Sequence, residues 1–118
     1  MIEQTIRQII ARRVHVEEIS QGEDYSEIEK CWNQLADTLC EDFDEAMRFL
    51  KEDCTEDEFS WISEVLDDVA RREGSSKFIY CYKDLMPKFQ EECEKYNIHE
   101  IVALAERILE EEKANGKG

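Results

Sequence analysis

The stretch TEDEFSWISEVLDDVARR, residues 55–72, contains the clearest fold signals in this 118-residue sequence. Thr55 is followed three residues later by Glu58, which is the pattern of a helix capping box, and carboxylates in a first turn suit the positive end of the helix dipole. Apolar residues then recur at spacings of three and four, which places five of them on one helical face: Phe59, Ile62, Leu66, Val69 and Ala70. The stretch therefore predicts one amphipathic helix from Thr55 to about Arg72.

The same spacing continues through most of the chain, and only four glycines and one proline interrupt it. Further helices are predicted from Ile2 toward Ile19, from Ser26 (capped with Glu29) to Leu39, and from Glu41 or Asp42 to Cys54. Three more are predicted after a stop at Gly74: one from Ser75 or Ser76, one around Phe89–Tyr96 after a kink or break at Pro87, and one from Asn97 (a capping box with Glu100) to Ile108. Short connections favour antiparallel packing. The predicted fold is all-α: one domain, residues 1–118, of about six or seven antiparallel amphipathic helices in a bundle or small array, with a frayed or disordered tail at 110–118.

Composition and charge narrow the classes of function. The chain carries 30 acidic and 15 basic residues, and its net charge of −15 would repel nucleic acid and anionic lipid while attracting basic proteins. We therefore expect no direct nucleic-acid binding and no membrane binding, although acidity that serves only solubility is an open alternative. Five dispersed cysteines among apolar neighbours, without a leader or a membrane-spanning run, predict reduced core thiols and a cytoplasmic protein.

Motifs for catalysis or metal binding are not found in the sequence. The chain has two histidines, His15 and His99, and lacks paired CxxC motifs, Glu-x-x-His helices and glycine-rich phosphate loops. Cysteines on apolar helix stripes are poor nucleophiles, and close carboxylate pairs arise by chance on so acidic a surface. The sequence therefore predicts a protein that is not an enzyme and that uses no cofactor and no metal.

The acidity is concentrated in residues 41–73, where thirteen acidic residues face four basic ones, so this segment holds nine of the fifteen excess negative charges. On a continuous helix of 100° per residue, Trp61 lies about 120° from the centre of the apolar face. It shares that side with Asp57, Glu64 and Asp68. Two interpretations stay open: Trp61 packs against a neighbouring helix, or it anchors a protein interface surrounded by carboxylates. Tyr80, opposite an apolar stripe of its own helix, could extend such an interface.

Several segments together resemble helical immunity proteins of bacterial contact-dependent growth inhibition systems. The resemblance rests on CTEDEFSWISEVLDDVAR (54–71), SSKFIYC (75–81), WNQLADTL (32–39) and FLKEDC (49–54), and it spans roughly residues 26–109. It implies a cytoplasmic protein that binds the toxin domain delivered by a neighbouring cell and blocks its active site, commonly that of a nuclease. An acidic surface fits this role, because a nuclease presents a basic cleft to phosphates.

The sequence thus predicts an immunity protein, a monomer that neutralises a basic toxin domain, expected to be an RNase, in a one-to-one complex. The predicted toxin-binding residues are Asp57, Trp61, Glu64, Asp68 and Tyr80. The alternative is a helical adaptor or oligomerisation module, unrelated to toxins, in which an exposed apolar face binds another protein or a second copy.

Overall fold

The computed structural model describes residues 2–73 and 76–112, and within them the regular elements are all helical. In chain order they are α1 (Ile2–Ser20), α2 (Tyr25–Glu41), α3 (Phe43–Glu52), α4 (Glu56–Ile62), the 3-10 helix η1 (Ser63–Val65), α5 (Leu66–Glu73), α6 (Lys77–Leu85), the 3-10 helix η2 (Met86–Phe89), α7 (Gln90–Lys95) and α8 (Ile98–Glu112). The predicted all-α fold is confirmed.

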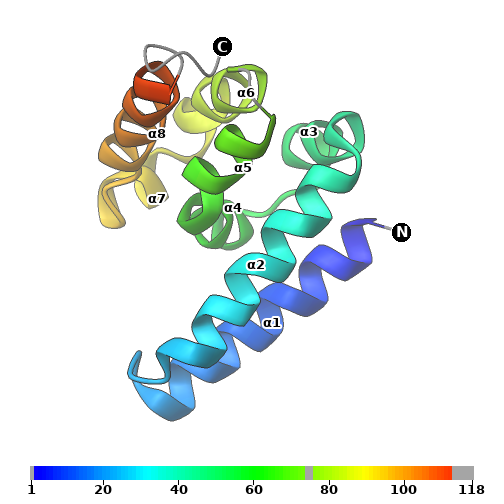
Figure 1. Ribbon diagram of the computed structural model, residues 1–118, viewed down its shortest axis with the longest axis vertical. Helices are drawn as coiled ribbons and strands as arrows, with labels where there is room; N and C mark the ends of the chain where they lie inside the picture. Colours follow the sequence, from blue (N-terminus) through cyan, green and yellow to red (C-terminus); the bar gives the residue numbers. More distant parts are fainter. Residues whose placement is uncertain (1, 74–75, 113–118) are drawn as a thin grey trace.

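Helices α1 and α2, the two longest among the described residues, form an antiparallel hairpin. The turn of this hairpin projects beyond the shorter helices (Figure 1). The turn contains Gln21 and Gly22 at positive φ of 53° and 80°, a conformation in which glycine carries no steric penalty. Asp24 then caps α2, since its carboxylate accepts from the backbone N–H of Glu27 at 3.3 Å. The prediction that Ser26 caps this helix is wrong by one half-turn.

The predicted helix over 55–72 is interrupted by one 3-10 turn. Its capping box is confirmed: Thr55 accepts from the N–H of Glu58, and the Glu58 carboxylate accepts from the N–H of Thr55. The hydroxyl of Ser63 donates to the carbonyl of Ser60 at 2.5 Å, and such serine bonds to the preceding turn often bend helices. The α-helix ends at Ile62 and resumes at Leu66, so the rotation of 100° per residue does not hold across residues 63–65.

The C-terminal third agrees with the sequence at Pro87 and differs from it at Asn97. The break at Pro87 is confirmed, because α6 ends at Leu85 and Pro87 lies at the start of η2. The capping box at Asn97 is wrong: Asn97 has a positive φ of 60°, and its side-chain amide donates to the Glu100 carboxylate instead of accepting from the backbone. Helix α8 extends to Glu112, into the predicted tail, while Gly74, Ser75 and residues 113–118 lie outside the described residues.

An aromatic cluster lies at the centre of the core. The Phe59 ring is fully buried, stacks on Tyr82 with ring centroids 4.0 Å apart, and lies 4.6 Å from the Phe89 ring. The Tyr82 hydroxyl donates to the backbone carbonyl of Phe59, which satisfies the one polar group of that buried side chain. These contacts join α4, α6 and η2.

All five cysteines are free thiols, and four of them are buried. Burial raises the pKa of the Cys54 thiol to about 12, and it also raises the pKa values of Cys81 and Cys93. Such thiols are poor nucleophiles near neutral pH. The prediction of reduced core thiols agrees with this environment.

Candidate functional site

Trp61 is half-buried against the core, and its ring is covered on one face by an arginine from another helix. The guanidinium carbon of Arg13, on α1, lies 4.9 Å from the centroid of the Trp61 ring, within the range of a cation–π contact. Arg13 donates two hydrogen bonds to the Glu64 carboxylate, at 2.9 and 3.0 Å, and one to Glu17 at 2.8 Å. A part-buried, bidentate ion pair therefore joins the hairpin to η1 beside the indole.

A second tryptophan completes this network. The indole N–H of Trp32, on α2, donates to Glu64 at 2.9 Å, so Glu64 bonds to α1 and α2 at once. Burial alone would lower the pKa of Arg13, but its hydrogen bonds to Glu64 and Glu17 outweigh that effect, and the pKa ends above its ordinary value. Arg13 is thus permanently charged, and its carboxylate partner Glu64 fixes the orientation of both the Arg13 guanidinium and the Trp32 indole.

The predicted toxin-binding residues divide between separate parts of the surface. Trp61 and Glu64 lie together around Arg13, whereas Asp68 is bonded to Arg72, which also reaches Asp37 on α2. The 3-10 turn at 63–65 explains this separation, because it rotates Asp68 away from the line that a continuous helix would give.

Asp57 and Tyr80 have different positions relative to the Arg13 network. Asp57 is exposed and lies one helical turn before Trp61 on α4, outside the residues that line the Trp61 pocket. Tyr80 is 55% exposed and lines a small hollow with Leu109 and Glu110, at the C-terminal part of α8. Trp61 instead shares its pocket with Ile101, near the N-terminus of α8. The five predicted residues therefore do not form one continuous binding face.

The pocket beside Trp61, which we call the Trp61 cleft, has a volume of about 390 Å³ and lies between the hairpin and the α7–α8 corner. It is lined by Arg13, Glu17, Ser60, Trp61, Ser63, Glu64, Tyr96 and Ile101. Because Arg13 and Glu64 neutralise each other in its wall, the cleft offers mainly the apolar surfaces of its aromatic and aliphatic residues.

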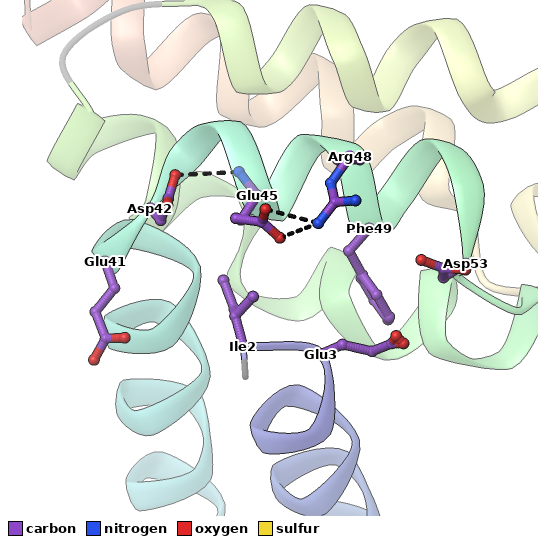
Figure 2. Close-up of a pocket in the computed structure, with 8 residues that line it drawn as sticks. All are labelled: Ile2, Glu3, Glu41, Asp42, Glu45, Arg48, Phe49 and Asp53. Atoms are coloured by element: carbon purple, nitrogen blue, oxygen red, sulfur yellow. Dashed lines mark hydrogen bonds and ion pairs between the residues drawn. The ribbon is translucent and has the colours of Figure 1, made fainter.

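A second concave site, the acidic pocket, lies where the start of α1 meets the end of α2 and the length of α3 (Figure 2). It has a volume of about 360 Å³, and five carboxylates and one arginine surround two apolar side chains. The lining residues are Ile2, Glu3, Glu41, Asp42, Glu45, Arg48, Phe49 and Asp53.

The charges of the acidic pocket are only partly balanced by its own lining. Arg48 pairs with Glu45 at 2.6 Å, as Figure 2 shows, and Arg7, outside the lining, pairs with Glu3 at 3.4 Å. Asp42 accepts from the backbone N–H of Glu45 as the cap of α3. Phe49 is only 3% exposed, and the guanidinium carbon of Arg7 lies 5.4 Å from its ring centroid, so the accessible apolar side chain of the lining is Ile2. The lining keeps a net negative charge beside it, which suits the ammonium or guanidinium group of a lysine or arginine and part of its aliphatic stem.

Sequence reasoning missed the acidic pocket. Glu41, Asp42 and Glu45 adjoin one another in sequence, but Glu3 and Asp53 come close only after α1 packs against α3. A pattern within a single helix contains no signal for that meeting. The partial signal was the start of the acidic segment at Glu41.

In comparisons with protein-family models, curated proteins and solved structures, the chain has no significant match. The likeness to immunity proteins accordingly stays a prediction. Across the described residues, the helices are too short or too polar for any of them to cross a membrane. No group of three or more His, Cys, Asp or Glu side chains within those residues could hold a metal ion.

Proposed function

We propose that this chain is an immunity protein, which binds a cationic toxin domain, expected to be a nuclease, and blocks it. The observation that carries the proposal is the acidic pocket, where five carboxylates surround the half-buried side chain of Ile2. Its composition supports recognition of basic side chains, and the net charge of −15 supports attraction of a basic partner from a distance. The proposed docking centre thus moves from the Trp61 side of α4, predicted from sequence, to the junction of α1, α2 and α3.

The physical basis of inhibition is competition with phosphate. A nuclease holds its substrate through lysine and arginine side chains that are ready to pair with anions. Carboxylates arranged around a hollow offer those side chains a substitute, while the half-buried side chain of Ile2 can cover part of their aliphatic stems. Complementary charge mainly accelerates association, so binding should weaken as salt increases.

We expect the double variant Glu41→Lys/Asp53→Lys to bind its toxin at least about tenfold more weakly than the wild-type chain, chiefly through slower association. Both residues are exposed, so the helices should persist, which circular dichroism can check. The binding partner in the assay is the protein encoded by the gene adjacent to that of this chain, and surface plasmon resonance gives both rate constants.

The matched control is Asp84→Lys/Glu110→Lys, which changes the net charge equally at two exposed positions outside both the acidic pocket and the Trp61 cleft. Its affinity should fall by less than about threefold, because screening limits the effect of distant charges. Equal losses of affinity in the two double variants would show that the acidic pocket contributes only through the net charge of the protein. Tight binding by both would refute the pocket as the contact.

Exposed apolar residues at the end of the hairpin favour the alternative, an adaptor or oligomerisation module. Ile19 is 70% exposed and Tyr25 is 65% exposed, and single apolar residues in such positions are common but can also form contacts. Under this alternative the purified chain would self-associate in analytical ultracentrifugation, and Ile19→Ser/Tyr25→Ser would abolish the association. The immunity proposal instead expects a monomer.

A further inference from the structure

We propose that the Trp61 cleft is a second contact for the same partner and that it receives an apolar side chain flanked by lysine or arginine. This inference rests on the proposed function, because it assumes a cationic protein partner. It assigns a separate role to each concave site: the acidic pocket attracts basic groups, and the Trp61 cleft anchors an apolar one.

The apolar surface of the cleft comes from three elements. Trp61 belongs to α4, Tyr96 follows α7 and is 45% exposed, and Ile101 belongs to α8. Ile101 also lines an adjoining hollow with Leu104, which is 47% exposed, so the apolar surface continues along α8. Aromatic side chains grouped around a concavity are typical of the positions that contribute most binding energy in protein interfaces.

The charges around the cleft favour a cationic occupant. Segment 17–29, which forms the end of the hairpin, contains six acidic residues. Glu17 pairs with Arg13, and Glu27 pairs with Arg12 and Lys30, so the six carboxylates exceed these three cations by three negative charges. Segment 90–100, at the α7–α8 corner, contains four acidic residues and one lysine, Lys95, whose ammonium lies 5.3 Å from the centroid of the Tyr96 ring. The cleft is lined by Glu17 of the first segment and Tyr96 of the second, and both segments carry a net negative charge, so basic residues beside the apolar anchor of a peptide would match them.

The wall of the cleft is held in place before any partner arrives. Arg13 is only 8% exposed, and its bonds to Glu64 and Glu17 fix it over the Trp61 ring. The bond from Trp32 to Glu64 fixes that carboxylate in turn. A preformed wall loses little side-chain freedom when it binds a ligand, which favours affinity.

A synthetic peptide tests the inference without any toxin. The probe is acetyl-Gly-Lys-Phe-Arg-Gly-amide, and the readout is the indole N–H resonance of Trp61 in two-dimensional NMR spectra during titration. We expect a saturable shift of this resonance. Replacing phenylalanine by alanine in the peptide should weaken binding about tenfold, because the anchor is lost. Replacing both basic residues by glutamate should weaken it at least as much, because the two negative segments then repel the peptide.

Two variants of the protein localise the effect. Tyr96→Ala should weaken binding of the phenylalanine peptide about fivefold, whereas Tyr80→Ala, at another exposed tyrosine outside the cleft, should change it less than about twofold. Equal binding of the phenylalanine and alanine peptides would overturn the inference, and so would equal effects of the two variants. If the peptide binds as expected but the adjacent gene product is not neutralised, the cleft stands and the immunity proposal fails. If the peptide does not bind and the Tyr96→Ala variant still neutralises the adjacent gene product, the inference about the cleft fails and the immunity proposal stands.

Discussion

Replacing Phe59 by alanine is expected to lower the free energy of unfolding by about 4 kcal/mol. The Phe59 ring is fully buried, and it contacts the rings of Tyr82 on α6 and Phe89 on η2. Alanine would leave a cavity at the point where three helical segments meet. The loss of ring stacking would add to the loss of buried apolar area.

Urea unfolding followed by circular dichroism measures this effect, and Phe59→Leu is the matched control. Leucine keeps most of the apolar volume, so its cost should be about half that of alanine or less. A loss below about 1 kcal/mol for Phe59→Ala would show that the aromatic cluster is not the centre of the core.

Glu64→Ala is expected to lower the free energy of unfolding by about 3 kcal/mol, a large effect for a residue that is not apolar. The change leaves the guanidinium of Arg13 buried with Glu17 alone, and it removes the acceptor of the Trp32 indole N–H. The cost arises chiefly from the charge that stays behind, because its removal from water is no longer compensated.

Two further variants separate charge from hydrogen bonding in this network. Glu64→Gln keeps an acceptor for Trp32 while removing the charge, so its loss should be smaller than that of Glu64→Ala. The double variant Arg13→Met/Glu64→Leu removes the whole ion pair and should recover much of the lost stability. If Glu64→Ala unfolds at the same urea concentration as the wild-type chain, the pair is solvent-screened and does not join the hairpin to η1.

Helical periodicity predicted the helices well, because burial of one face selects the residue at every third or fourth position. The same pattern concealed the turn at 63–65, since Ile62, Leu66 and Val69 keep helical spacing on both sides of it. The signal for the break was the pair Ser60 and Ser63, whose hydroxyls bond to backbone carbonyls of the preceding turn. Helical periodicity describes only where apolar residues recur, so it does not reveal that serine hydroxyls compete with backbone N–H groups for these carbonyls.

The candidate sites were harder to predict because their members are distant in sequence. Arg13 and Trp61 are separated by 47 intervening residues, and only the packing of α1 against α4 brings the guanidinium over the indole. The sequence correctly placed Trp61 outside the centre of the apolar stripe, and the half-buried indole is the result. No pattern within a single helix indicates that a cation lies over one face of the Trp61 indole.

The central proposal, that this chain neutralises a cationic toxin, is tested most directly by a growth-rescue assay. Bacteria that express the adjacent gene product should stop growing and should recover when the wild-type chain or Asp84→Lys/Glu110→Lys is co-expressed. Glu41→Lys/Asp53→Lys, at equal cellular abundance, should restore growth poorly, because the acidic pocket has lost its negative charge. Failure of the wild-type chain to rescue a toxic neighbour would contradict the immunity proposal. Full rescue by Glu41→Lys/Asp53→Lys would contradict the site assigned to it.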